Sequence, residues 1–189
     1  MAVSNELYLL RIRTYSVTGY ILSNGKDQSM KLWDLRMVMS RHDFKTMTPD
    51  PRAGRNDFDY RWGSYDDEDW YADRNDNSLV TFRGHRVLRT LIRCHFSPPG
   101  STNSRYVYSG SEDGKVYIWN MDATLAGTID VQAATRNSRP PHRGYHQMGA
   151  WDEEQDFSRS VWKTCVRDAS WHPSAPMIVG MCTFFNSAA

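Results

Sequence analysis

The sequence predicts an all-β protein built from repeated hairpins, on two observations. Tryptophan (7), tyrosine (10) and phenylalanine (7) are abundant among the 189 residues, and aromatic side chains favour strands. An internal repeat is the second observation. The segments 20–34 (YILSNGKDQSMKLWD) and 106–120 (YVYSGSEDGKVYIWN) both carry Ser, Asp and Trp at the same three distances after a Tyr. Four coincident positions of distinct chemistry make a chance match improbable.

Each copy reads as two short strands joined by a polar tight turn, at 24–27 and at 111–114. The second copy is preceded by Gly84-His85 and by a strand-like run, 87–100, that closes with a Pro-Pro-Gly turn. A Gly-His pair, a strand, a turn and a hairpin ending in Trp-Asp form the WD-repeat signature. This repeat folds as one four-stranded propeller blade per roughly 40 to 45 residues. We therefore expect a WD-repeat β-propeller.

The blades expected from the sequence are too few for a closed ring. A third, partial copy begins at 164–180 and lacks the turn Asp and the Trp, and residues 1–19 contain no Gly-His before the first hairpin. An open set of blades exposes apolar faces and strand edges. We therefore expect residues 1–189 to form an incomplete propeller, with two blades and part of a third of a seven-bladed ring, and the chain to be a fragment.

Two long irregular insertions explain the spacing of the blades. The hairpins begin at residues 20 and 106, about twice the propeller period apart, so the connection holds either a degenerate blade or an insertion. Because 37–77 is polar and lacks apolar alternation, we favour an acidic and aromatic insertion loop there. A polar insertion loop is expected at 132–160. The runs 78–82 and 124–131 are expected to be outer strands of the two blades.

Composition argues against several classes of function. The net charge of +1 gives no global basis for nucleic-acid binding. Three scattered cysteines are too few for a secreted disulfide scaffold, which favours an intracellular protein of the nucleus or cytoplasm. The apolar run near the N-terminus is too short for a signal peptide or a membrane span. Protein partners remain the expectation, with no nucleic acid and no membrane.

The second repeat carries the residue types of a hydrolase triad, which leaves two interpretations open. One takes Ser109 as a nucleophile with His85 as its base. The other, which we favour, is a buried structural tetrad in which a hydrogen-bonded chain runs from the turn Asp through His and Ser to the indole of Trp. The residues of this expected tetrad are His85, Ser109, Asp113 and Trp119, with Ser23 and Asp27 repeating it beside Trp33 in the first hairpin. We expect no catalytic, cofactor-binding or metal site.

Arg36 lies two residues beyond the Trp33-Asp34 pair and has no counterpart in the second hairpin, which ends WNMD. In a blade, this position leaves the third strand at the rim of the propeller. A guanidinium there is free to pair with a partner's carboxylates or carbonyls.

The segment 21–36 (ILSNGKDQSMKLWDLR) resembles the DWD box of substrate receptors for cullin-RING ubiquitin ligases that use a DDB-type adaptor. Further matches, among them TFRGH and the run TLIRC-x-FSP, follow the order found in the DDB- and cullin-associated factors of the factor-eleven type. The resemblance covers roughly 20–36, 78–122 and 164–173, whereas 1–15 and 181–189 do not match.

This resemblance implies a WD-repeat receptor that links a DDB-type adaptor to a degradation target. Arg36 would contact the adaptor, with Asp34 and Trp33 framing it. The alternatives are a WD-repeat scaffold unrelated to ubiquitin, in which Arg36 has no such role, and a non-functional fragment.

Overall fold

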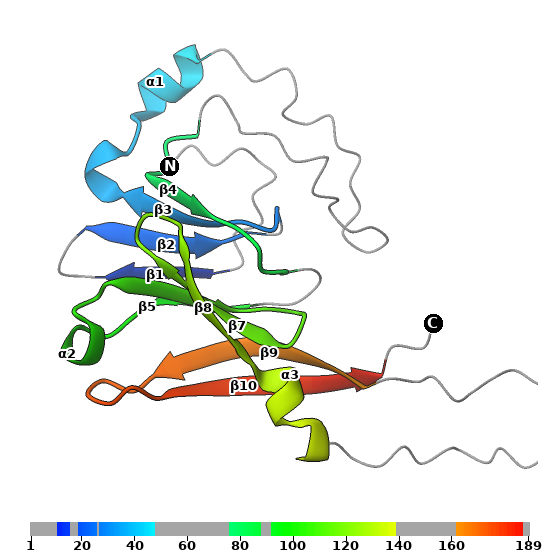
Figure 1. Ribbon diagram of the computed structural model, residues 1–189. Helices are drawn as coiled ribbons and strands as arrows, with labels where there is room; N and C mark the ends of the chain where they lie inside the picture. The colour runs from blue at the N-terminus through cyan, green and yellow to red at the C-terminus, as the bar shows by residue number, and fades with distance from the viewer. Residues whose placement is uncertain are drawn as a thin grey trace, which may run out of the picture.

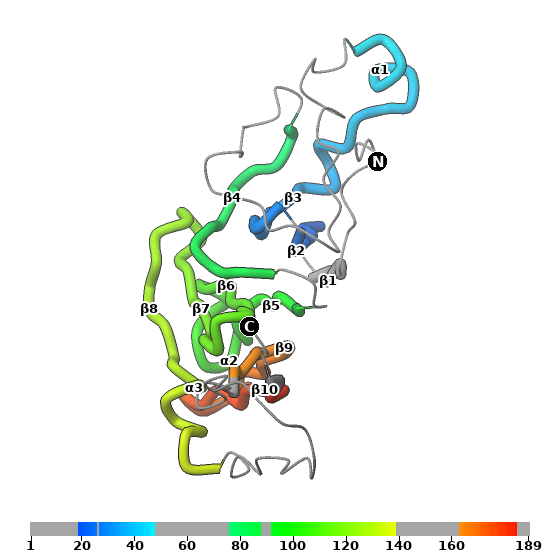
Figure 2. Tube along the Cα trace, turned by 90° about the vertical axis from the view of Figure 1, so that its right-hand side faces the viewer, coloured from blue at the N-terminus to red at the C-terminus, as the bar shows by residue number. Residues whose placement is uncertain are grey.

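Three antiparallel β-sheets are stacked in the computed structural model of the chain (Figure 1). The structure describes residues 11–15, 19–25, 27–47, 76–87, 92–138 and 162–186. Sheet A, formed by strands between residues 11 and 82, and sheet C, formed by strands between 162 and 186, lie on opposite sides of sheet B, formed by strands between 94 and 130 (Figure 1 and Figure 2). The all-β fold class expected from the sequence is confirmed, and the described sheets are consistent with part of a propeller.

Sheet A has four strands in the order of the chain. They are β1 (Arg11–Tyr15), β2 (Tyr20–Asn24), β3 (Met30–Asp34) and β4 (Val80–Phe82). The outer strand β4 pairs with β3, Met30 lying opposite Phe82, as expected for the run 78–82. The inner strand β1 was not expected, because no Gly-His or turn signal precedes it in the sequence.

Sheet B repeats this plan further along the chain. Its strands are β5 (Cys94–Phe96), β6 (Tyr106–Gly110), β7 (Lys115–Asn120) and β8 (Leu125–Asp130). The Pro-Pro-Gly turn becomes the one-turn helix α2 (Pro99–Thr102) between β5 and β6. The outer strand expected at 124–131 is confirmed as β8. Sheet C contains β9 (Trp162–Trp171) and β10 (Ile178–Asn186), paired as a hairpin with a bulge between Met181 and Cys182.

Sheet B is covered on both faces, and the alternation of side chains along its strands shows why. Val107 and Trp119 point toward sheet A and join a buried cluster with Leu22 and Phe82. The neighbouring positions point toward sheet C, where Tyr108 and other apolar residues pack on β9. Successive side chains of a strand face opposite sides, so one sheet serves two interfaces.

The recurring Asp of the repeat stabilises the turn of each hairpin. The Oδ1 atom of Asp27 accepts a hydrogen bond from the backbone N–H of Ser29 (3.3 Å), and Asp113 Oδ1 accepts one from Lys115 N (3.2 Å). Each is a side-chain bond to a backbone group two residues on, which is the Asx-turn pattern. The left-handed backbone at Gly114 (φ 81°) completes the second turn.

The expected insertions begin with local helical structure rather than loop. After the 3₁₀ helix η1 (Leu35–Met37), the segment 37–77 contains the helix α1 (Arg41–Thr46), capped by Ser40. The segment 132–160 begins inside α3 (Val131–Ala134), followed by η3 (Arg136–Ser138). The remaining parts of both insertions, 48–75 and 139–160, lie outside the described residues, and the expectation of loops stays a prediction there.

Candidate functional site

Arg36 is fixed at the exit of β3 by the carboxylate of Asp34. Asp34 caps the 3₁₀ helix, because its Oδ1 accepts a hydrogen bond from the backbone N–H of Arg36 (2.9 Å). The guanidinium also donates from Nε to Oδ1 (2.9 Å) and from Nη2 to Oδ2 (2.8 Å). This bidentate geometry holds the planar head group in one orientation.

Tyr20 forms the second support of the guanidinium. Its ring lies 5.5 Å from Arg36 Cζ, within cation–π range, and its hydroxyl accepts a hydrogen bond from Nη2 (3.1 Å). The side chain of Arg36 is nevertheless 69% exposed, and Nη1 donates no hydrogen bond to any residue that the structure describes. The structure therefore presents a rigid cationic head with one NH₂ group available to a partner.

The Asp34–Arg36 pair is charged on both sides at neutral pH. Hydrogen bonds from Arg36 hold the pKa of Asp34 below its usual value, and Asp34 raises the pKa of Arg36. The third residue expected to frame this site, Trp33, points its indole Nε1 at Ser23 Oγ (2.8 Å) on the neighbouring strand. Trp33 thus ties β3 to β2 just before the chain reaches Asp34.

The corresponding corner of sheet B has a different chemistry. Asn120 and Asp122 stand where sheet A has Asp34 and Arg36, and both are engaged with Thr124 in the turn to β8. Tyr106, the counterpart of Tyr20, stacks on Trp171 of sheet C with ring centroids 6.0 Å apart. The supported guanidinium is therefore particular to sheet A among these two hairpins.

The expected chain of tetrad hydrogen bonds is not the one that the structure contains. Asp113 binds the hydroxyl of Tyr117 (2.7 Å) rather than His85, and the indole of Trp119 donates to the carbonyl of Arg83 (3.2 Å) rather than to Ser109. His85 meets Trp119 through an edge-on ring contact, with centroids 5.3 Å apart. In the second repeat the tetrad prediction is wrong in its bonds, and Asn24 of the neighbouring sheet binds His85 Nε2 and Ser109 Oγ instead. In the first hairpin the expected bond from Trp33 to Ser23 is present.

Asn24 is the residue that sequence reasoning missed. Its Oδ1 accepts a hydrogen bond from His85 Nε2 (2.8 Å), and its Nδ2 donates to Ser109 Oγ (3.0 Å). All three side chains are buried. The network therefore joins sheet A, the loop after β4 and sheet B. The available signal was the alignment of the two hairpins, in which Asn24 stands opposite Gly110.

This geometry also excludes the hydrolase interpretation of Ser109. Its hydroxyl is fully buried and donates to the carbonyl of Gly110 (2.9 Å), while His85 is bonded to Asn24. Burial lowers the pKa of His85 to about 4, against a smaller opposing influence of Asp113. A nucleophile needs a base within hydrogen-bond reach and access to substrate, and Ser109 has neither here.

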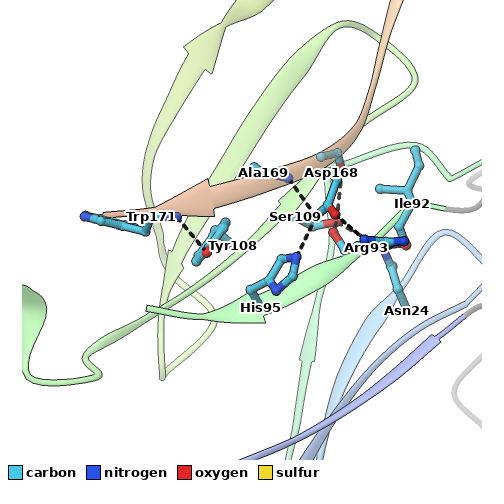
Figure 3. A network of polar contacts seen from close by, with 10 residues as sticks. Asn24, Ile92, Arg93, His95, Tyr108, Ser109, Asp168, Ala169 and Trp171 are labelled. Carbon is cyan, nitrogen blue, oxygen red and sulfur yellow. Dashed lines mark hydrogen bonds and ion pairs between the residues drawn. The ribbon is translucent and has the colours of Figure 1, made fainter. Parts of the chain in front are cut away.

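A second polar network joins sheet B to sheet C (Figure 3). Asp168 of β9 accepts hydrogen bonds from Arg93 Nη1 (2.6 Å) and from His95 Nε2 (2.7 Å). Burial would raise the pKa of Asp168, but the hydrogen bonds from His95 and Arg93 outweigh it and lower the pKa. Tyr108 completes the contact by accepting a hydrogen bond from the backbone of Trp171 (3.0 Å).

The described residues contain no group of three or more His, Cys, Asp or Glu side chains arranged to hold a metal ion. Among the same residues, no helix has the length and apolar character needed to cross a bilayer.

Comparison with known proteins assigns the repeat. Residues 76–120 match the family model described as WD domain, G-beta repeat. The chain is a WD-repeat protein. The matched repeat begins just before β4 and ends with β7, so it takes its first strand from sheet A and the next three from sheet B. One WD repeat thereby ties two neighbouring blades together.

Two groups of relatives resemble this WD-repeat chain over most of its length. A LEC14B homolog of Prunus armeniaca is 40% identical over 161 residues, 85% of this chain and 27% of that protein. A DDB1- and CUL4-associated factor 11 homolog of Caenorhabditis elegans is 36% identical over 160 residues, 85% of this chain and 22% of that protein. The factor-eleven resemblance noted in the sequence is therefore confirmed. The chain spans about a quarter of the length of the curated relatives it matches.

Proposed function

We propose that this WD-repeat chain is a non-catalytic interaction protein that docks on the ubiquitin-ligase adaptor DDB1 through Arg36. In this role it links a cullin-RING ligase to proteins that become ubiquitinated. The homologues named DDB1- and CUL4-associated factor 11 support the choice of partner. The observation that carries the proposal is the Arg36 head group, which Asp34 and Tyr20 fix while it stays largely exposed.

The geometry favours a neutral acceptor on the partner. Asp34 already balances the charge of Arg36. A carboxylate on the partner would therefore gain less electrostatic free energy from Arg36 than from a guanidinium without an acidic neighbour. The Nη1 group can donate to a backbone carbonyl or a hydroxyl at low entropic cost, because the side chain is held in place before binding. Arg is one of the residue types enriched among the side chains that dominate interfaces.

A binding measurement with purified DDB1 tests the proposal. We expect Arg36→Ala to weaken binding by tenfold or more, on the order found for interface hot spots. Arg36→Lys should lose most of the affinity as well, since an ammonium cannot reproduce the two-pronged contact with Asp34. Biolayer interferometry with immobilised DDB1 gives the affinities, and circular dichroism confirms that each variant is folded.

The control is Arg105→Ala, which removes another exposed Arg from the turn before β6. It should leave the affinity unchanged. Equal binding by Arg36→Ala and the parent chain would contradict the Arg36 contact, whereas failure of the parent chain to bind DDB1 would favour a WD-repeat scaffold unrelated to ubiquitin. In that case Arg36 is an ordinary surface residue.

A further inference from the structure

Exposed apolar side chains are concentrated in the stretch of sequence on either side of Arg36. Four of the ten large apolar side chains that are exposed in the described residues lie within ten positions of the chain: Leu35, Met37, Val38 and Phe44. Of the other six, Met177, Val179 and Met181 occupy alternate positions at and just before the start of β10, whereas Leu79, Leu125 and Ile129 lie before β4 and on β8. Scattered exposed apolar residues are normal, but four of them along one short segment beside a fixed cation indicate a candidate interaction surface.

The sister hairpin shows that this exposure is not a consequence of the blade architecture. In sheet B the residues after Trp119 turn inward, and Met121 and Ala123 pack against the core between sheets A and B. In sheet A the Asp34 cap starts a 3₁₀ helix instead, none of whose residues is buried. Asp34 therefore has two effects, since it orients the Arg36 head group and directs the following apolar residues outward.

The helix α1 continues the same surface. It is closed at its start by Ser40, whose Oγ accepts a hydrogen bond from Asp43 N (3.1 Å), yet it buries none of its residues. A helix of six residues has little stability of its own and gains most of it from packing an apolar side against something else. Phe44 supplies such a side chain and is exposed.

The charge of this segment indicates which surface it fits. Beyond Arg36, whose charge Asp34 balances, this segment contains Arg41 and Lys45 against a single acid, Asp43, which gives a formal charge of +1 with His42 neutral. The side chain of Asp43 is engaged by the hydroxyl of Ser40 (2.6 Å). Apolar residues interleaved with cations complement an apolar groove with carboxylates along its border.

We propose that residues 35–47 form a second binding element, continuous with Arg36, that seats Met37, Val38 and Phe44 in an acid-bordered apolar groove of the protein partner. This rests on the proposed function, because the partner is the same adaptor. The three methionines of the segment, Met37, Met39 and Met47, suit such a contact, since unbranched thioether side chains adapt to irregular pockets. The cations at 41 and 45 steer the approach and add little to the final contact.

The first experiment measures binding of the full chain to DDB1 with the apolar side chains shortened. We expect Met37→Ser and Phe44→Ser each to weaken binding by about fivefold or more. The matched control is Met177→Ser, because Met177 lies just outside a strand and is exposed to nearly the same extent (56%, against 58% for Met37). That control should bind as the parent chain does.

Charge-neutralised variants test the steering separately. Arg41→Gln with Lys45→Gln should lower the association rate a few-fold and reduce its dependence on salt, with little change in the dissociation rate. Stopped-flow or biosensor traces at two ionic strengths give both rates. An unchanged association rate contradicts the acidic border of the groove.

Two measurements on the chain alone decide whether something else covers the segment. Phe44→Ser should leave the melting temperature unchanged, because the side chain is exposed in the free protein. A fall of several degrees means that the chain covers Phe44 itself and overturns the proposal. Sedimentation should show that the parent chain does not self-associate through this segment. Self-association that Phe44→Ser removes would mean that a second copy of the chain, and not the adaptor, covers residues 35–47.

The failures of the two proposals are distinguishable. If Arg36→Ala abolishes binding while Met37→Ser and Phe44→Ser bind normally, the second element is wrong and the docking function stands. If the Ser variants weaken binding while Arg36→Ala does not, the apolar element stands without the Arg contact. If none of these variants changes the affinity, both proposals fail.

Discussion

The hairpins of sheets A and B have the same backbone plan but join their neighbours in different ways. Both use an Asp at the turn to bind a backbone N–H two residues on. They differ at the last residue of the first strand, which is Asn24 in sheet A and Gly110 in sheet B. Asn24 reaches sheet B with its side chain, whereas Gly110 lets the backbone of β9 approach directly.

This difference shows that one position decides whether two blades meet through side chains or through backbone. Between sheets A and B, the side-chain amide of Asn24 forms hydrogen bonds with two buried side chains, His85 and Ser109. Between sheets B and C, the backbone N–H of Val166 donates to the carbonyl of Ser111 (3.0 Å), and Asp168 adds an ion pair with Arg93. Repeat proteins depend on such neighbour contacts, because a blade cannot bury its faces alone.

The largest effect is expected where the backbones touch. A Cβ atom on Gly110 would lie well inside the van der Waals contact distance of the Val166 carbonyl oxygen, which belongs to rigid backbone. We expect Gly110→Ala to lower the free energy of unfolding by about 3 kcal/mol, the upper part of the range for overpacked cores. Urea denaturation followed by circular dichroism measures this change.

The control for this substitution is Gly127→Ala on β8, where an added Cβ meets no atom within 4 Å. It should change the free energy of unfolding by no more than about 0.5 kcal/mol. If the two Ala variants were equally stable, sheets B and C would not be joined by the close backbone contact described here.

The second largest effect is expected at the hydrogen bonds of Asn24, which join sheets A and B. Asn24→Ala removes both side-chain partners of the buried groups on His85 and Ser109, and we expect a loss of about 2 to 3 kcal/mol, since unpaired buried donors keep their desolvation cost. A double-mutant cycle with His85→Ala separates the shared interaction from the lost packing. Strictly additive losses would show that the bond from His85 to Asn24 contributes nothing.

The two hairpins also show which strands could be predicted from the sequence. Local signals sufficed for the hairpins themselves, since an Asp in the turn and alternating apolar residues act within a few positions of the chain. Outer strands such as β4 followed from apolar runs next to Gly-His. The strand β1 lacked any such signal and could be found only from its pairing with β2.

The site was predicted in part for a related reason. Arg36 could be singled out because it is absent from the second hairpin, and its support by Asp34 follows from a separation of two residues. The partners of His85 could not be found in this way, because Asn24 is 61 positions distant and belongs to another blade. Bonds between blades depend on the packing of whole sheets, which the pattern of one repeat does not contain.

The smallest expected effect is a difference in pH response between the contact of sheets A and B at His85 and the contact of sheets B and C at Asp168. His85 has a pKa of about 4 in the folded chain because of burial, against 6.5 as its ordinary value. Between these values the unfolded chain binds more protons than the folded one, so stability is complete above pH 6.5 and falls as the pH drops toward 4. From this shift we expect a loss of about 2 kcal/mol between pH 7 and pH 5.

His85→Gln isolates this contribution, because the Gln amide can still donate to Asn24 Oδ1 but does not titrate in this range. Urea denaturation at pH 7 and at pH 5 should show a smaller loss for His85→Gln than for the parent chain, by about the same 2 kcal/mol. The Asp168 junction should not contribute in this window through its carboxylate, whose pKa is lowered by His95 and Arg93 despite its burial. A loss that persists in His85→Gln would place the acid sensitivity outside the Asn24 network, and the two junctions would then differ in geometry but not in their response to pH.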